Sequence, residues 1–194
     1  TRSQFLARGS VSKAIAVLQE AILADPKLSP AYELLGDLYG KQKNWQEAEK
    51  NLLDAKKYGT PTARLLSNLG LVKERLGLSA EAIELYKQAL EIDPGYAMAY
   101  NNLGVYYLNR KEYKMAARSL RQAIRADSQL AEAHHNMGKT YFSEAVALEK
   151  KENPSEKDKT DAKELINKAY DCFDTALIIH SELSDALYHK ALVA

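Results

Sequence analysis

The chain has 194 residues, of which 46% are hydrophobic and 27% are charged, and this composition excludes an intrinsically disordered protein. Its 27 Lys and Arg residues nearly balance its 26 Asp and Glu residues, so we expect no nucleic-acid partner and no polybasic membrane-surface binding. The single cysteine, Cys172, cannot form a disulfide within the chain. No apolar run approaches the roughly 20 residues that span a bilayer, so we also expect no direct membrane insertion.

In chain order, the sequence predicts helices that pair into successive hairpins. Gln4 to Arg8 would be the last turn of a first helix that precedes a second helix at about 11–24. Later first helices are expected at about 30–42, 63–76, 97–110, 131–150 and 184–193. Their second helices are expected at about 45–58, 79–92, 113–126 and 157–180. Gly59 is a predicted helix stop, and Pro61 suits the start of the helix that follows.

A period of 34 residues organises these helices. Glycines that follow Leu or Met recur at this interval, at Gly36, Gly70, Gly104 and Gly138. Alanines stand 12 and 19 positions after the first three glycines, with a large residue between them at Leu52, Tyr86 or Leu120. Small residues are needed where two helix backbones approach closely, and the large residues fill the space between neighbouring hairpins. Each hairpin alone leaves an apolar face exposed, so stability requires stacking.

This pattern resembles the tetratricopeptide repeat family. Pro26 and Pro94 fit the family's proline near the end of a repeat, and Trp45 and Tyr113 fit its aromatic residue at the turn. The resemblance implies an all-α, right-handed α-solenoid of antiparallel helix hairpins. We expect one array over residues 1–194, with a partial repeat at 1–28, repeats at 29–62, 63–96, 97–130 and 131–183, and a partial repeat at 184–194. The chain starts without a methionine and within a predicted hairpin, so we expect a fragment of a longer protein.

A charged insertion at about 149–165 interrupts the period. Gly138 and Ala169 are 31 residues apart, where the other repeats have 12, so 19 residues have been added. The turn signal at Pro154 has helical sequence on both sides, which predicts that both helices of this hairpin are longer by about two turns. Two interpretations stay open: a solvated extension without a function, and a charged prong that contacts a partner.

The resemblance implies that the first helices line a concave face, where a peptide would bind. The candidate groove residues stand one position after the repeat glycine, or two or three before it: Asn68, Asn101, Asn102, Val105, His135, Asn136 and Lys139. Each asparagine amide offers a donor and an acceptor, which could pair with the backbone of an extended peptide. This is similar to the asparagine ladder in the repeat domain of O-linked GlcNAc transferase. The alternative is that asparagine before Leu-Gly is only a common filler of this repeat.

Other kinds of site find little support. His134 and His135 are adjacent on a predicted helix and point in different directions, so they make a poor metal pair. No nucleophile stands beside a base and no Gly-rich phosphate loop is present, so we expect no catalytic residue, no cofactor and no metal. Glu33 and Ser67 occupy the place of the first lysine in the carboxylate clamp of chaperone-binding members, so we expect no recognition of a chaperone C-terminus. Cys172 is interpreted as a packing or surface thiol.

These features predict a non-enzymatic module that binds an extended peptide or a partner protein in its groove, as a scaffold or adaptor. One alternative is a homo-oligomeric structural scaffold that associates through its end hairpins. Another is a regulatory or substrate-recruiting arm of an enzyme whose catalytic domain lies outside this chain. We expect a cytoplasmic location; a periplasmic one would require a signal removed upstream.

Overall fold

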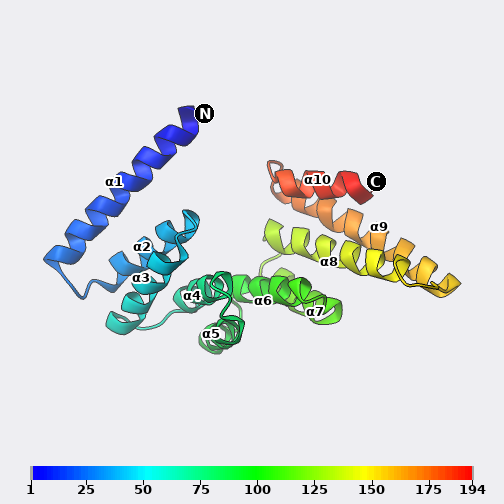
Figure 1. The fold of residues 1–194 in the computed structure, drawn as a ribbon, viewed down its shortest axis with the longest axis horizontal. Coiled ribbons are helices and arrows are strands. Elements are labelled where there is room, and N and C mark those ends of the chain that lie inside the picture. The colour runs from blue at the N-terminus through cyan, green and yellow to red at the C-terminus, as the bar shows by residue number, and fades with distance from the viewer. Residues whose placement is uncertain (1, 194) are drawn as a thin grey trace. The chain divides into compact units, whose positions relative to one another are not determined.

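The computed structural model describes residues 2–193, with side chains from residue 10 onward. Its described part is built from helices joined by short turns and contains no strand (Figure 1). The chain divides into two compact units, Thr1–Pro94 and Gly95–Ala194, and each is described by itself. The predicted all-α class is confirmed.

The first unit contains one single helix and two hairpins. The single helix is α1 (Arg2–Ala24), the first hairpin pairs α2 (Ser29–Lys41) with α3 (Trp45–Tyr58), and the second pairs α4 (Ala63–Arg75) with α5 (Ser79–Ile92). Helix α1 packs on α2, and α3 packs on α4, so each element is stacked on the next (Figure 1).

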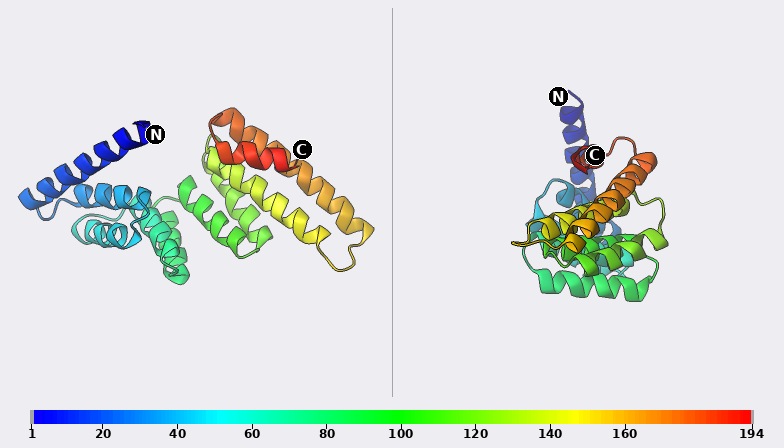
Figure 2. Two further views of the ribbon diagram at one scale, coloured as in Figure 1. Left: turned by 45° about the horizontal axis from the view of Figure 1, so that its top comes forward. Right: turned by 90° about the vertical axis from the view of Figure 1, so that its right-hand side faces the viewer.

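The second unit also contains two hairpins and a final helix. The hairpins are α6 (Ala97–Asn109) with α7 (Tyr113–Ala126), and α8 (Ala131–Glu149) with α9 (Glu156–Ile179), and they are followed by α10 (Ser184–Val193). Helix α7 packs on α8, while α10 lies against α9 and α8 (Figure 2). The four hairpins fall inside the predicted repeats, whose outer boundaries remain a prediction.

The repeat glycines mark where the two helices of a hairpin touch. A Cβ atom added to Gly36 would lie 2.5 Å from Leu52 Cγ, and one added to Gly70 would lie 2.7 Å from Tyr86 Cε1. In the hairpin with the insertion, Phe173 fills the same role against Gly138 at 2.5 Å. The repeat alanines are fully buried, from Ala48 and Ala55 onward. Glycine and alanine are therefore required because larger side chains would separate the helix backbones.

Three hairpin turns use the same backbone geometry. Lys43, Gly77 and Lys111 follow one another at the repeat period, and all have positive φ angles, of 60°, 83° and 62°. In each turn the N–H of this residue donates to a carbonyl three residues earlier, and the next N–H donates to the carbonyl five residues before it. This pattern is a Schellman motif, in which a left-handed residue ends the helix.

The N-terminal helix differs from the prediction. The sequence predicted a turn between Arg8 and Val11, but the backbone runs as one α-helix through Arg2–Ala24. The segment lacks proline, and the only described helix that α1 packs against is α2. A turn near Arg8 would therefore gain no packing against a second helix. The side chains of Gln4 to Arg8 lie outside the described part of the chain.

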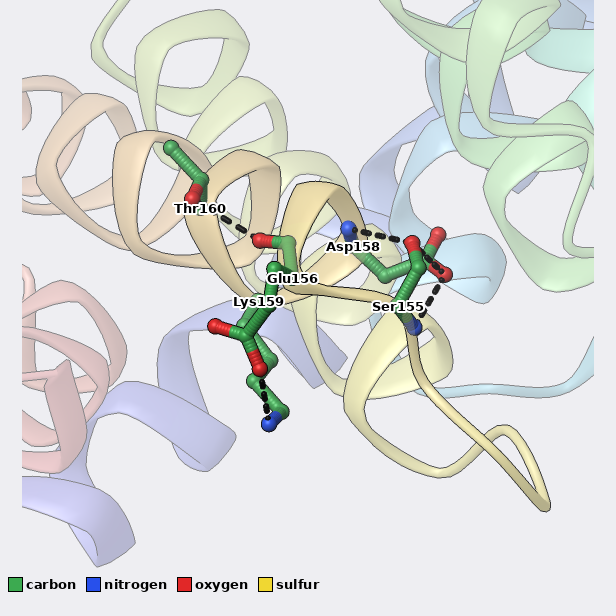
Figure 3. Close-up of polar contacts among 5 residues, drawn as sticks. All are labelled: Ser155, Glu156, Asp158, Lys159 and Thr160. Atoms are coloured by element: carbon green, nitrogen blue, oxygen red, sulfur yellow. Dashed lines mark hydrogen bonds and ion pairs between the residues drawn. The ribbon is translucent and has the colours of Figure 1, made fainter.

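The insertion lengthens both helices of its hairpin. Helix α8 has 19 residues and α9 has 24, against 13 and 14 in the hairpin before them. The predicted extension is confirmed, and α9 has the length of the helix predicted at about 157–180. Ser155 begins α9 with a capping box: its Oγ accepts from the Asp158 N–H, and the Ser155 N–H donates to the Asp158 carboxylate (Figure 3). The cap explains why the charged segment folds as helix rather than as a loop.

Candidate functional site

In the first unit, polar side chains link the first helices α2 and α4. Asn68 Nδ2 donates to Asp37 Oδ1 at 2.7 Å. Arg64, one turn earlier on α4, forms ion pairs with Glu33 at 2.9 Å and with Asp37 at 3.5 Å. Asn68 is therefore held in one orientation, because its amide is bound to the neighbouring first helix.

Glu33 lies where a chaperone-binding relative would carry a lysine, and its environment is distinctive. Burial raises the pKa of Glu33, although the nearby Arg64 acts in the opposite direction. The Oε1 atom is buried and lies 2.9 Å from Arg64, but without the geometry of a hydrogen bond. The contact is therefore a charge pair, and it binds α2 to α4 instead of presenting a cation to a ligand.

A pocket of about 310 Å³ opens between α2 and α4, beside Asn68. Its apolar lining comes from Leu52, Leu71, Val72 and Trp45, of which Leu52 and Val72 are almost fully buried. Polar and charged groups complete it, namely Asp37, Asn68, Lys41 and Arg75. Lys41 and Arg75 are exposed, so they lie at the mouth, while Leu52 and Val72 form the floor.

In the second unit, an amide contact of the same kind links α6 and α8. Asn136 Nδ2 donates to Asn101 Oδ1 at 3.0 Å. Asn136 remains half-buried, whereas Asn101 and Asn102 are only 5% and 9% exposed. Val105 and Lys139, one position after their glycines, are also half-buried. Asn101 thus contributes to the packing of two first helices, and its predicted role in the groove stays a prediction.

His135 is also buried, and its contacts are aromatic. Its ring lies 5.7 Å from the Phe173 ring and 5.1 Å from the His189 ring, and its Nε2 is 3.3 Å from His189 Nδ1. Burial lowers the pKa of His135 to about 4, with smaller contributions in the same direction from His189 and Lys139. The imidazole is therefore neutral near pH 7 and joins α8, α9 and α10 rather than offering a charge to a ligand.

The seven predicted groove residues are therefore unequal in access. Asn68 lines the first-unit pocket, while Val105, Asn136 and Lys139 keep partial exposure in the second unit. Asn101, Asn102 and His135 are buried, and binding through any of the seven remains a prediction. Of the pocket lining, Gly40 and Lys41 were missed from the sequence. The signal was present, since Gly40 is a second glycine in its helix, where later repeats carry larger residues.

The described residues show little that resembles reactive chemistry. Among them, no group of three or more His, Cys, Asp or Glu side chains could hold a metal ion. Burial raises the pKa of the Cys172 thiol to about 11, and its side chain packs against the cluster formed by Ala117, Leu120 and Met137. No helix in the described range is both long and apolar enough to cross a bilayer.

Comparison with known proteins identifies repeat proteins. The profile of a family described as tetratricopeptide repeat matches residues 28–94 and 61–129. Human tetratricopeptide repeat protein 6 is 31% identical over 121 residues, which cover 62% of this chain and 23% of that protein. The chain spans less than a quarter of the length of the curated relatives it matches.

Two solved structures illustrate the likeness in fold. YrrB, described as a tetratricopeptide protein with an unusual peptide-binding site, has a TM-score of 0.58 and 22% identity, covering 97% of this chain and 88% of that one. The human IFIT1 dimer with m7Gppp-AAAA has a TM-score of 0.80 and 15% identity, covering 94% of this chain and 42% of that one. At these identities the likeness concerns the fold alone.

Proposed function

Because this chain belongs to the tetratricopeptide repeat family, we propose that it is a non-catalytic scaffold or adaptor that binds an extended segment of a partner protein along its first helices. YrrB, which shares the fold, is described as having a peptide-binding site. The near-neutral charge balance favours a protein partner over nucleic acid. Recruitment of substrates to a catalytic domain elsewhere in a longer protein is a compatible extension of the same role.

The observation that carries this proposal is the matched pair of amide contacts. In each unit, an asparagine two positions before a repeat glycine donates to the preceding first helix, as Asn68 does to Asp37 and Asn136 to Asn101. A primary amide has two N–H donors and a carbonyl acceptor. A single hydrogen bond therefore orients the amide and leaves further donor and acceptor capacity for a ligand. Amides oriented in advance reduce the entropy lost when an extended peptide becomes ordered on them.

Panning a displayed library of random peptides on the chain tests this proposal. We expect enriched peptides that bind at least about tenfold more weakly to the Asn68→Ala or Asn136→Ala variant. Asn167→Ala is the matched control, because Asn167 is exposed on α9 and distant in sequence from both amides. Binding of a single-stranded RNA in place of any peptide, or peptides indifferent to both amide variants, would contradict the proposal.

Association between copies is a second candidate, and one surface favours it. Leu187, Tyr188 and Leu192 on α10 are 60%, 62% and 50% exposed. Large apolar side chains gathered on one short helix favour contact with another apolar face. Sedimentation velocity over a range of concentrations tests this candidate, and Leu187→Glu should shift any dimer toward monomer.

A further inference from the structure

The pocket between α2 and α4 exists because a side chain is missing from its wall. A Cβ atom added to Gly40 would meet nothing within 4 Å. In the following first helices the same register carries Glu74, Leu108 and Phe142. Gly40 therefore leaves an empty space on α2. The apolar side chains of Leu71 and Trp45 line this space.

The size and lining of this pocket limit what can fill it. A volume of about 310 Å³ is at the small end of the range for ligand sites. It suits one or two amino-acid side chains and is too small for most cofactors. The nearly buried Leu52 and Val72 at its floor have no polar atom to offer, so an apolar side chain is favoured there.

The charges at the mouth favour an anion. Lys41 and Arg75 are exposed, and neither forms an ion pair with another residue in the described part of the chain. The acidic residue of the lining, Asp37, is already bound by Asn68 and Arg64. The unmatched charge around the pocket is therefore positive, and it complements a carboxylate.

We propose that this pocket binds an apolar side chain of a partner peptide, while Lys41 and Arg75 bind an acidic side chain next to it. The inference rests on the proposed function in requiring that the partner is a peptide. It goes further by assigning a sequence preference, namely an apolar residue beside Asp or Glu. Asn68, on the wall of the pocket, is placed to pair with the peptide backbone between them.

The test uses fluorescent peptide pools with random flanks and one fixed central pair: Leu-Glu, Leu-Lys or Ala-Glu. Fluorescence anisotropy should show the Leu-Glu pool binding about tenfold more tightly than either other pool. Gly40→Leu should weaken Leu-Glu binding about tenfold by filling the pocket, and Gly40→Ala should weaken it less. Ala147→Leu, on an exposed part of α8, is the matched control.

The charge assignment has its own variants. Lys41→Gln combined with Arg75→Gln should abolish the preference for Leu-Glu over Leu-Lys. Lys87→Gln, an exposed lysine of α5, should leave this preference unchanged.

Two results would overturn the pocket: equal binding of the three pools, or unchanged Leu-Glu binding by a Gly40→Leu variant of native helicity. If Gly40→Leu disturbs the fold, unchanged binding by Gly40→Ala is equally decisive. Peptides sensitive to Asn68→Ala or Asn136→Ala but indifferent to Gly40→Leu would reject the pocket and leave the proposed function intact. Binding of no pool and no library peptide would reject both.

Discussion

Lys73 on α4 forms an ion pair with Glu49 on α3, with 2.7 Å between Nζ and Oε1. The same Nζ lies 2.7 Å from Glu81 Oε2 on α5. Three helices therefore meet at one ammonium group, whose side chain is only 12% exposed. The other repeats have an aromatic residue in this register, at Tyr39, Tyr107 and Tyr141, so this repeat replaces ring packing by charge pairing.

The Lys73 network predicts a measurable loss of stability on substitution. Hydrogen bonds with Glu49 and Glu81 raise the pKa of Lys73, which shows that the folded chain favours the charged form. Lys73→Met would leave two carboxylates without their cation, at a cost of about 1–2 kcal/mol because the site is only partly buried. Urea unfolding followed by circular dichroism measures this change.

Lys87→Met is the control for that experiment, since Lys87 is exposed and in no ion pair with a described residue. Equal unfolding midpoints for the two variants would show that the network adds nothing. The stability that Lys73 contributes also depends on pH in a defined direction. A raised lysine pKa contributes stability below the unfolded value of about 10.4, and this contribution is lost as the pH rises through the folded value.

In the Schellman turns, exchanging lysine for glycine and glycine for lysine should change the stability of the chain in opposite directions. Lys111 adopts a φ of 62°, a conformation that costs an L-residue roughly 1 kcal/mol and costs glycine little. Lys111→Gly should therefore stabilise the chain by about 0.5–1 kcal/mol, even though glycine is disfavoured elsewhere in helices. Gly77→Lys, with the same φ region in the neighbouring turn, should destabilise by a similar amount.

Thermal unfolding of these two variants and of Lys87→Gly tests the argument. Lys87 is exposed within helix α5, where glycine costs about 1 kcal/mol relative to alanine. A Lys111→Gly variant that loses as much stability as Lys87→Gly would show that the turn does not favour glycine.

The sequence predicted the hairpins well because their packing rule is local and periodic. Gly36 with Leu52, and Gly70 with Tyr86, can be identified from spacing alone, and both pairs meet in the structure. The insertion was found in the same way, from a changed interval. In contrast, the turn predicted near Arg8 was wrong, because a single helix runs through that position. The repeat register alone does not show which helices pack beside this segment.

The candidate site was harder to predict because neighbouring residues on a helix differ by about 100° in direction. Asn102 and Asn101 both fit a groove by register, yet both are buried. Asn101 also accepts a hydrogen bond from the amide of Asn136. Deciding which residue faces a partner requires the angle between helices, which periodicity does not specify. Gly40 was overlooked for a related reason: a missing side chain becomes a pocket only when the surrounding helices are in place.

His135 predicts how the second unit responds to acid. Burial lowers the pKa of His135 to about 4, whereas an unfolded histidine titrates near 6.5. Between these values the unfolded chain binds more protons than the folded one, so the contribution is present above pH 6.5 and is lost as the pH falls toward 4. Groups facing the ring are His189, Lys139 and Asp185, and Asp185 alone favours the charged form.

We expect the stability of the wild-type chain to fall by about 1–3 kcal/mol between pH 7 and pH 4.5 through this one residue. His135→Asn should remove that part of the pH dependence, because asparagine occupies the same register at Asn101 and does not titrate. His180→Asn is the matched control, since His180 is exposed after α9. Urea unfolding of both variants at the two pH values measures the effect. Equal slopes with pH for His135→Asn and the wild type would show that the buried imidazole does not control acid sensitivity, and that the carboxylates of the exposed ion pairs do.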